Sequence, residues 1–212
     1  MANVRPRHIA WRLALTLVVL LSGCVGLSEP FRDDFSNSDS GWRAATRETY
    51  VRGYLQGWYV FQIDVPRWFV WATAGRRYRD VSLEVTARSE GSTDNHFGLV
   101  CRYQEGDFYY FAVSADGYYA IYRRDAAGES LIPLTGRAML RTPTLRTGGT
   151  ENRIRAVCEG EQLTLYVNGE QVVQVEDATL TVGDVGMAAG TLRESRTSVW
   201  FDDFEATVPE RR

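Results

Sequence analysis

The sequence predicts an all-β protein built as one antiparallel β-sandwich, and three observations carry this prediction. Between residues 31 and 208, short runs of alternating apolar and polar residues recur, and no long segment shows the 3.6-residue period of an amphipathic helix. Asp116-Gly117 and Asn168-Gly169 each separate two such runs, and these dipeptides favour the tight turns of β-hairpins. Hydrophobic residues make up 44% of the 212-residue chain, which is enough apolar material for the core of a single domain.

The N-terminal residues have the pattern of a secretory signal. Arg5, Arg7 and Arg12 precede an apolar run over residues 13–21, which is too short to span a bilayer. The following Leu21-Ser22-Gly23-Cys24 resembles the bacterial lipobox. This resemblance implies cleavage before Cys24 and lipidation of its thiol, and two acyl chains would hold the protein stably on a membrane. A plain signal peptide with an incidental cysteine is the alternative.

We therefore expect three parts: a lipoprotein signal peptide over residues 1–23, a lipid-anchored tether over residues 24–30 and a folded domain over residues 31–208. The expected location is extracytoplasmic, on the cell membrane or the outer membrane. Without residues 1–23, the chain has 21 basic and 27 acidic residues, a net charge of −6. An acidic domain lacks the basic surface that nucleic acids require, so nucleic-acid binding is excluded as the main function.

Three runs show the clearest strand alternation, over residues 81–88, 96–103 and 153–158. The residues expected on their buried faces are Val81, Leu83, Val85, Ala87, Phe97, Leu99, Cys101, Tyr103, Ile154, Ala156 and Cys158. Those expected on their outward faces include Glu84, His96, Gly98, Arg102, Arg153 and Arg155. If both Asx-Gly pairs form two-residue type I′ turns, the first hairpin sets Val113 opposite Ala120, Phe111 opposite Tyr122 and Tyr110 opposite Arg123.

Two cysteines remain once Cys24 is assigned to the lipid. Cys101 and Cys158 both fall on apolar faces of expected strands, and the compartment outside the cytoplasm is oxidising. The sequence therefore predicts a disulfide between them, with two buried free thiols as the alternative.

Four segments carry a family resemblance. They are Phe31-Arg32-Asp33-Asp34-Phe35, Asn95-x-x-Gly98-x-x-x-Arg102, Leu163-Thr164-Leu165-Tyr166-Val167-Asn168-Gly169 and Phe201-Asp202-Asp203-Phe204. In this order they resemble the concanavalin A-like, laminin-G-like jelly roll, and in particular the exo-inulinase accessory module and the 3-keto-disaccharide hydrolase group. The resemblance implies that the first and last strands of the domain lie side by side.

The sequence lacks the usual catalytic signatures. Laminarinase-type glycosidases with this fold carry Glu-x-Asp-x-x-Glu on one strand, and that spacing does not occur here. We find no Gly-x-Ser-x-Gly elbow and no phosphate-binding loop. No catalytic residue is therefore assigned. If the chain is an enzyme, it would be a hydrolase resembling the 3-keto-disaccharide hydrolases, with Glu84 acting beside Arg102.

Outward-facing residues are the candidates for contacts with a ligand. Arginine forks bind hydroxyls and carboxylates, while aromatic rings stack on the apolar faces of sugars. The predicted ligand-binding residues are Arg102, His96, Asn95, Trp68, Trp71 and Tyr119. The alternative for each is an ordinary structural role, with arginine solvated on a strand and tryptophan in the core.

The acidic residues near both ends of the domain suggest a metal site. If the terminal strands pair, Asp33, Asp34, Asp202 and Asp203 would approach one another, and such oxygen ligands suit a structural Ca²⁺. The alternative is that these acids mark an exposed sheet edge and cap turns. No other cofactor is expected.

These features predict a lipid-anchored protein of the cell envelope that binds a carbohydrate or glycan without cleaving it. One alternative is the hydrolase described above, and another is a structural or adhesion module of the envelope.

Overall fold

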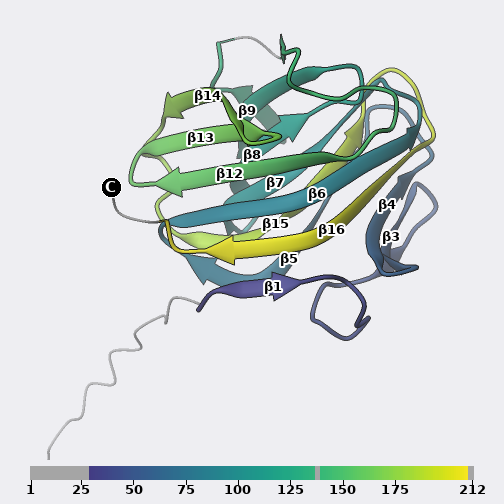
Figure 1. The fold of residues 1–212 in the computed structure, drawn as a ribbon, viewed down its shortest axis with the longest axis horizontal. Coiled ribbons are helices and arrows are strands. Elements are labelled where there is room, and N and C mark those ends of the chain that lie inside the picture. Colours follow the sequence, from purple (N-terminus) through teal and green to yellow (C-terminus); the bar gives the residue numbers. More distant parts are fainter. Residues whose placement is uncertain (1–28, 137–138, 210–212) are drawn as a thin grey trace, which may run out of the picture.

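The computed structural model describes residues 29–136 and 139–209, which form sixteen strands and no helix. The strands make two antiparallel sheets that stack face to face (Figure 1). The predicted all-β sandwich is confirmed. The predicted signal peptide, the lipidation site Cys24 and the tether up to residue 28 lie outside the described residues. In the part of the chain that is described, no helix is long and apolar enough to cross a membrane.

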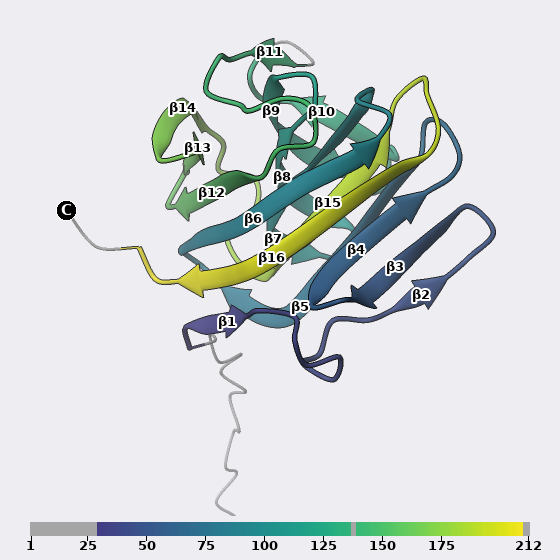
Figure 2. The same ribbon diagram turned by 45° about the vertical axis from the view of Figure 1, so that its right-hand side comes forward.

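The nine-stranded sheet has the order β14-β13-β12-β6-β16-β4-β3-β2, and β1 also pairs with β16. Its strands β2, β3 and β4 form one edge, which is clear in Figure 2. The bounds are Phe31–Asp33 (β1), Ala45–Thr46 (β2), Tyr50–Leu55 (β3), Trp58–Ile63 (β4), Val81–Gly91 (β6), Asn152–Glu159 (β12), Gln162–Val167 (β13), Glu170–Glu176 (β14) and Thr197–Thr207 (β16).

The seven-stranded sheet has the order β10-β9-β8-β7-β15-β5, and β11 also pairs with β9. The bounds are Phe69–Tyr78 (β5), Asn95–Gln104 (β7), Asp107–Val113 (β8), Tyr118–Asp125 (β9), Ser130–Pro133 (β10), Leu140–Arg141 (β11) and Gly183–Thr191 (β15).

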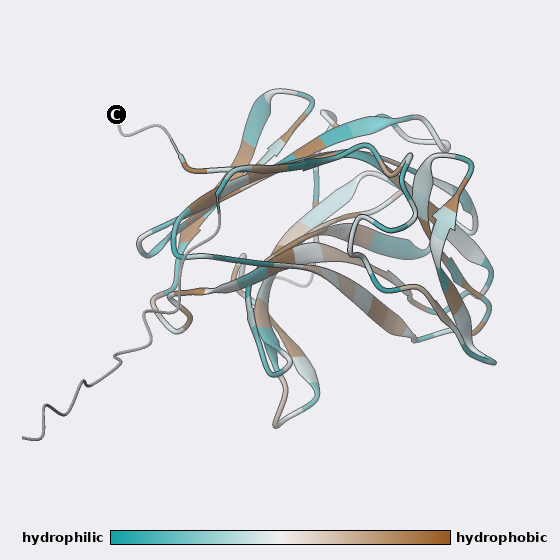
Figure 3. Cartoon of the chain, turned by 90° about the horizontal axis from the view of Figure 1, so that it is seen from below, coloured by the Kyte–Doolittle hydropathy of each residue, from teal (hydrophilic) through white to brown (hydrophobic). Residues whose placement is uncertain are grey.

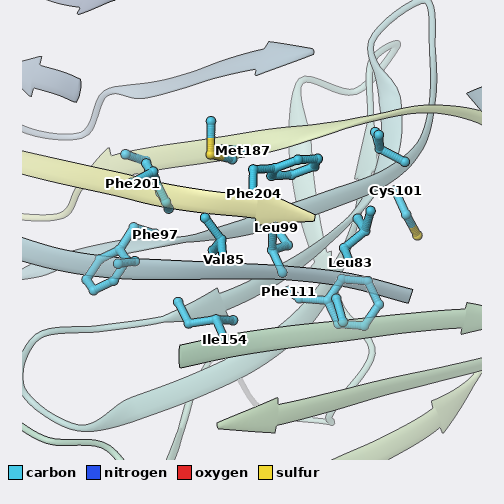
Figure 4. Packing of buried hydrophobic residues seen from close by; sticks show 14 of the residues in the cluster. Leu83, Val85, Phe97, Leu99, Cys101, Phe111, Ile154, Met187, Phe201 and Phe204 are labelled. Atoms are coloured by element: carbon cyan, nitrogen blue, oxygen red, sulfur yellow. The ribbon is translucent and has the colours of Figure 1, made fainter. Parts of the chain in front are cut away.

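The main core fills the space between the two sheets. Figure 3 shows the hydrophobic positions along the strands of both sheets. Leu83 and Val85 of β6 face Leu99 of β7 and Phe111 of β8 across this space (Figure 4). All four side chains are buried, and the alternation of β6 and β7 predicts this for Leu83, Val85 and Leu99. Burying a side chain of this size typically contributes about 1.5–3 kcal/mol, so the shared interior is the main source of stability.

The first and last strands lie side by side, as the family resemblance implies. In the antiparallel β1–β16 pair, Phe31 lies opposite Ala206 and Asp33 opposite Phe204. The two Asp-Asp-Phe segments therefore meet along the second half of β16.

Cys101 of β7 and Cys158 of β12 form a disulfide with an S–S distance of 2.02 Å. The bond confirms the predicted pairing. Because β7 and β12 belong to different sheets, it links the two layers covalently across the core.

The two predicted hairpins differ in outcome. At Asn168-Gly169, Val167 pairs with Glu170, and both turn residues have positive φ (50° and 89°), as a type I′ turn requires. At Asp116-Gly117 the turn is longer by one residue.

In the Asp116-Gly117 hairpin, the backbone N–H of Ser114 donates to the carbonyl oxygen of Tyr118 (2.8 Å), which closes a loop of three residues. The Ser114 hydroxyl also accepts a hydrogen bond from the N–H of Tyr118 (2.9 Å), and this contact favours the longer loop. The observed pairs are Val113 with Tyr119 and Tyr110 with Tyr122, so the predicted register is wrong by one residue.

Candidate functional site

The outer face of the seven-stranded sheet carries a second hydrophobic layer. A row of small residues crosses four strands, because Ala188, Gly98, Ala112 and Ala120 are successive partners in the ladders of β15, β7, β8 and β9. The space above this row is filled by aromatic side chains, which we call the outer aromatic layer: Phe69, Trp71, Tyr103, Phe108, Tyr110 and Tyr122.

Rings in the outer aromatic layer contact one another directly. The ring centroids of Phe69 and Tyr110 are 5.1 Å apart, and those of Trp71 and Phe108 are 5.5 Å apart. The guanidinium of Arg124 lies over the Trp71 ring at 4.8 Å. Such contacts hold the rings in fixed orientations.

A pocket of about 470 Å³ opens at one end of this layer, and we call it the Trp71 pocket. Trp71 and Tyr103 supply its aromatic wall. Thr73 and Asp184 contribute polar side chains from β5 and β15, and Asp184 is the partner of Tyr103 in the β15–β7 ladder. The remaining lining residues are Gly41, Arg43, Arg52 and Gly75.

Asp184 is held rigidly by the backbone. Its carboxylate accepts hydrogen bonds from the N–H groups of Gly75 (3.0 Å), Arg76 (2.7 Å) and Val185 (2.7 Å). The irregularity in the β15–β5 ladder next to Asp184 brings the first two donors to it, and Gly75 has the positive φ of 69° that the bend requires. Burial raises the pKa of Asp184, although these hydrogen bonds act in the opposite direction.

Arg52 of β3 and Arg43 line the pocket together with these groups. No ion pair or side-chain hydrogen bond holds either guanidinium within the described part of the chain. Nε of Arg52 is buried and has no hydrogen-bond partner.

Comparison with known proteins establishes the fold. No protein-family model and no curated protein matches the chain. Many solved structures resemble it, among them three from Bacillus species. Carbohydrate-binding module CBM66 from Bacillus subtilis has a TM-score of 0.55 and 16% identity, covering 77% of this chain and 94% of that one.

A Bacillus subtilis protein of unknown function with a galectin-like fold has a TM-score of 0.62 and 14% identity, over 88% of this chain and 99% of that one. The Bacillus licheniformis β-glucanase has a TM-score of 0.65 and 8% identity, over 87% and 100%. At such low identities the likeness shows the fold alone. It confirms the predicted jelly-roll sandwich of the concanavalin A-like type.

Of the predicted ligand-binding residues, only Trp71 lines the Trp71 pocket. Trp68 is 40% exposed and lies just before β5. Tyr119 of β9 is half-buried and packs against the main core.

Asn95 and His96 of β7 are buried and hydrogen-bonded within the protein. The Asn95 amide donates to the hydroxyl of Thr197 (2.9 Å) and accepts from the N–H of Ala115 (3.1 Å), so it connects β16 to the hairpin after β8. The His96 ring nitrogen Nδ1 is hydrogen-bonded to the Tyr110 hydroxyl (3.0 Å). Burial lowers the pKa of His96 to about 4. His96 points away from the main core, as predicted, but it is covered by Phe69 and Tyr110 of the outer aromatic layer. The side chains of Asn95 and His96 are both buried, and their role in ligand binding stays a prediction.

The position of the Arg102 side chain also differs from the predicted one. The residue has a positive φ of 56°, and the β7–β8 ladder is irregular between Cys101 and Gln104. This bulge reverses the alternation, so Arg102 is only 1% exposed while Tyr103 joins the outer aromatic layer. The predicted outward position of Arg102 and buried position of Tyr103 are both wrong.

Glu84 is not paired with Arg102. Its carboxylate forms an ion pair with Arg153 on the nine-stranded sheet, and it is absent from the hydrogen-bond partners of the Arg102 guanidinium. The structure therefore does not form the Glu84–Arg102 pair that the hydrolase alternative requires.

Three of the four acids near the domain ends, Asp33, Asp34 and Asp202, accept hydrogen bonds from nearby residues. The carboxylate of Asp33 accepts from the Trp42 indole N–H (2.9 Å) and the Phe35 N–H (2.9 Å), and that of Asp34 accepts from the Ser36 N–H (3.0 Å). Asp202 accepts from the N–H of Asp203 (2.7 Å). Among the residues that the structure describes, no group of three His, Cys, Asp or Glu is arranged to hold a metal ion. Asp33, Asp34 and Asp203 line a common pocket, while Asp33, Asp34 and Asp202 accept hydrogen bonds from nearby N–H groups, so a structural Ca²⁺ at these acids stays a prediction.

Sequence reasoning missed Tyr103, Asp184, Arg43 and Arg52 as pocket residues. Alternation places Tyr103 in the core, and the bulge at Arg102 that turns it outward leaves no clear mark in the sequence. Arg52 comes from β3 of the other sheet and Arg43 from the segment before β2, and no local pattern predicts that they line a pocket together with β5.

Proposed function

We propose that this chain binds carbohydrate in the Trp71 pocket and does not cleave it. The observation that carries the proposal is the composition of the pocket wall. The exposed parts of Trp71 and Tyr103 lie beside the polar groups of Thr73, Asp184 and Arg52. Aromatic rings pack against the C–H faces of a sugar, and the polar groups hydrogen-bond its hydroxyls. A volume of about 470 Å³ accommodates one or two sugar rings.

The fold supports this reading, since one structural neighbour is a carbohydrate-binding module and another is a β-glucanase. On the outer face of strand β8, Phe108 and Tyr110 belong to the outer aromatic layer, and Ala112 belongs to the row of small residues beneath it.

Hydrolysis of a glycosidic bond usually requires two carboxyl groups about 5–9.5 Å apart. Asp184 is the one carboxylate among the residues that line the Trp71 pocket. A single acid, held by backbone N–H groups, favours binding over catalysis.

We also propose that the domain is attached to a membrane through a lipid on Cys24. The support is the lipobox-like segment at residues 21–24, directly after the apolar run. Such an anchor would place the Trp71 pocket outside the cytoplasm, where glycans are available.

Binding is tested by titrating a panel of neutral and acidic oligosaccharides against the wild type and Trp71→Ala by isothermal calorimetry. We expect at least one ligand from the panel to bind, and we expect Trp71→Ala to weaken it tenfold or more. The matched control is Trp58→Ala, which removes a tryptophan of the nine-stranded sheet and should leave affinity unchanged. If no oligosaccharide binds the wild type, or if Trp71→Ala binds as well as the wild type, the proposal is refuted.

A further inference from the structure

The Trp71 pocket contains two positive side chains and one negative side chain, and the negative one does not neutralise the others. Asp184 accepts hydrogen bonds from three backbone N–H groups, and no ion pair joins it to Arg43 or Arg52. The pocket therefore has an excess of unpaired positive charge on a domain that is acidic as a whole.

Other arginines on the two sheets show a different arrangement. Arg32 pairs with Glu205 (2.7 Å), Arg123 pairs with Asp177 (2.9 Å), and Arg153 pairs with Glu84. In each of these pairs the chain itself supplies a carboxylate to an arginine on a strand.

Arg52 is the clearest exception. It is half-buried, and its Nε is fully buried without a hydrogen-bond partner. A buried donor that lacks a partner is costly, and the cost is larger for a charged group. Because Nε itself is buried, a ligand meets this guanidinium at its other nitrogens, where an anionic group offsets the unpaired charge and a neutral group does not.

We infer that the Trp71 pocket binds an acidic saccharide, one whose ring carries a carboxylate, as in a uronic acid. This rests on the proposed function and specifies its ligand. The two oxygens of a carboxylate match the fork of a guanidinium, which can donate two parallel hydrogen bonds to them. The sugar ring then lies against Trp71 and Tyr103, while the carboxylate lies toward Arg52 and Arg43.

The orientation follows from the positions of the groups. Trp71 and Tyr103 come from β5 and β7 of the seven-stranded sheet, and Arg52 comes from β3 at the edge of the nine-stranded sheet. The aromatic and cationic walls thus belong to different sheets. A ligand needs both a ring face and an anionic group to contact the two walls at once. Asp184, on the aromatic side, is placed to accept hydrogen bonds from ring hydroxyls.

The test compares uronic-acid oligosaccharides with their own methyl esters, because esterification removes the charge and keeps the sugar. The probes are trisaccharides of galacturonate, of mannuronate and of glucuronate, each as the free acid and as the ester, titrated at low and at high salt. We expect at least one acid to bind tenfold or more tightly than its ester at low salt. This preference should shrink at high salt.

Arg52→Gln and, separately, Arg43→Gln should lower the affinity for the acid more than the affinity for the ester, so that the preference for the acid shrinks. The control variant is Arg193→Gln, since Arg193 is 85% exposed and lies outside the pocket. Near-ultraviolet circular dichroism establishes that each variant is folded. Because Arg43 is exposed, its variant provides the readout if Arg52→Gln fails to fold.

The outcomes separate the two proposals. Equal binding of acid and ester, or binding of neutral sugars alone, overturns the inference and leaves carbohydrate binding intact. If Arg52→Gln and Arg43→Gln both keep the wild-type preference for the free acid over its ester, the inference is also overturned, because the carboxylate is then recognised elsewhere. If neither these probes nor the broader panel bind, both proposals fail.

Discussion

The guanidinium of Arg102 donates a hydrogen bond from Nη2 to the carbonyl oxygen of Gly160 across 2.8 Å. Arg102 directly follows Cys101, and Gly160 comes two residues after Cys158. A polar link and a covalent link therefore lie next to each other at the same end of the sandwich. Together they connect β7 of one sheet to the end of β12 of the other.

Arg102→Met should destabilise the protein strongly. Besides Gly160, the side chain donates to the carbonyl oxygens of Arg79 (3.0 Å) and Leu180 (2.7 Å). Methionine fills similar space but leaves these acceptors unsatisfied. We expect the free energy of unfolding to fall by about 3 kcal/mol or more, measured by urea denaturation. Arg193→Met, at an exposed site, should change it by less than about 0.5 kcal/mol. A loss below about 1 kcal/mol for Arg102→Met would contradict an internal role.

Removal of the disulfide should also lower stability. The bond closes a loop with a sequence separation of 57 residues, and the loss of loop-closure entropy on cross-linking corresponds to about 4 kcal/mol. We expect the double variant Cys101→Ala, Cys158→Ala to melt several degrees below the wild type in calorimetry. Addition of a reductant should lower the melting temperature of the wild type and leave that of the variant unchanged. A reductant effect of equal size in both would contradict this explanation.

The sequence predicted much of the fold because alternation reports directly on burial. The strands β6, β7 and β12, the type I′ turn at Asn168-Gly169 and the disulfide follow from local patterns. The patterns fail where one residue leaves the extended conformation. At Arg102 a single left-handed residue exchanges the two faces for the rest of β7, and in the hairpin after β8 the Ser114 hydroxyl favours a longer loop.

The candidate site was harder to predict than the fold for a second reason. Alternation shows which side chains point away from the core, but it does not show which sheet they belong to. Glu84 and His96 both alternate away from apolar neighbours, yet they lie on different sheets. His96 is also buried, because Gly190 beside it lacks the Cβ that would clash with the imidazole ring.

The stability of the protein should depend on pH through His96. Burial lowers the pKa of His96 from its ordinary value of 6.5 to about 4, so the folded state keeps the imidazole neutral over a range in which the unfolded state protonates it. The unfolded state then binds the additional proton, and stability falls as the pH drops from about 6.5 to about 4. Over the whole range this amounts to roughly 3 kcal/mol.

His96→Phe removes this titration and keeps a ring in the same space. We expect its free energy of unfolding to vary less between pH 7.5 and pH 5 than that of the wild type, as measured by urea denaturation at each pH. Identical pH dependence in the two proteins would show that other groups cause it.

Gly98→Ala should disrupt the seven-stranded sheet. A Cβ at this position would lie well inside van der Waals contact with the carbonyl oxygen of Phe111 on the neighbouring strand β8. We expect a loss of at least about 2 kcal/mol, or failure to fold. Gly148→Ala is the control, because a Cβ there meets no atom within 4 Å although φ is 74°. It should cost only about 1 kcal/mol. Equal losses in the two variants would indicate that contact with β8 is not the cause.

The proposed anchor predicts a change in processing. Cys24→Ala removes the only thiol in the lipobox-like segment, so the variant should not incorporate a fatty-acid analogue in metabolic labelling. We expect the variant to remain at its unprocessed length on a denaturing gel. Cys158→Ala, which leaves Cys24 in place, is the control and should be labelled normally. Labelling of Cys24→Ala at the wild-type level would exclude lipidation at this residue.

The pairing of β1 with β16 determines how the domain responds to mechanical force. A pull applied through the residues before Phe31 reaches the three-residue strand β1 first. Three interactions hold β1 in place: the short β1–β16 ladder, the contact between the rings of Phe31 and Phe204 (6.2 Å between centroids) and the hydrogen bond between Trp42 and Asp33. Tension would peel β1 from the end of β16 before it strained the central strands. The wall of the Trp71 pocket on β5, β7 and β15 would stay in place, whereas Gly41 and Arg43 follow β1 in the chain and would be the first part of the pocket to move.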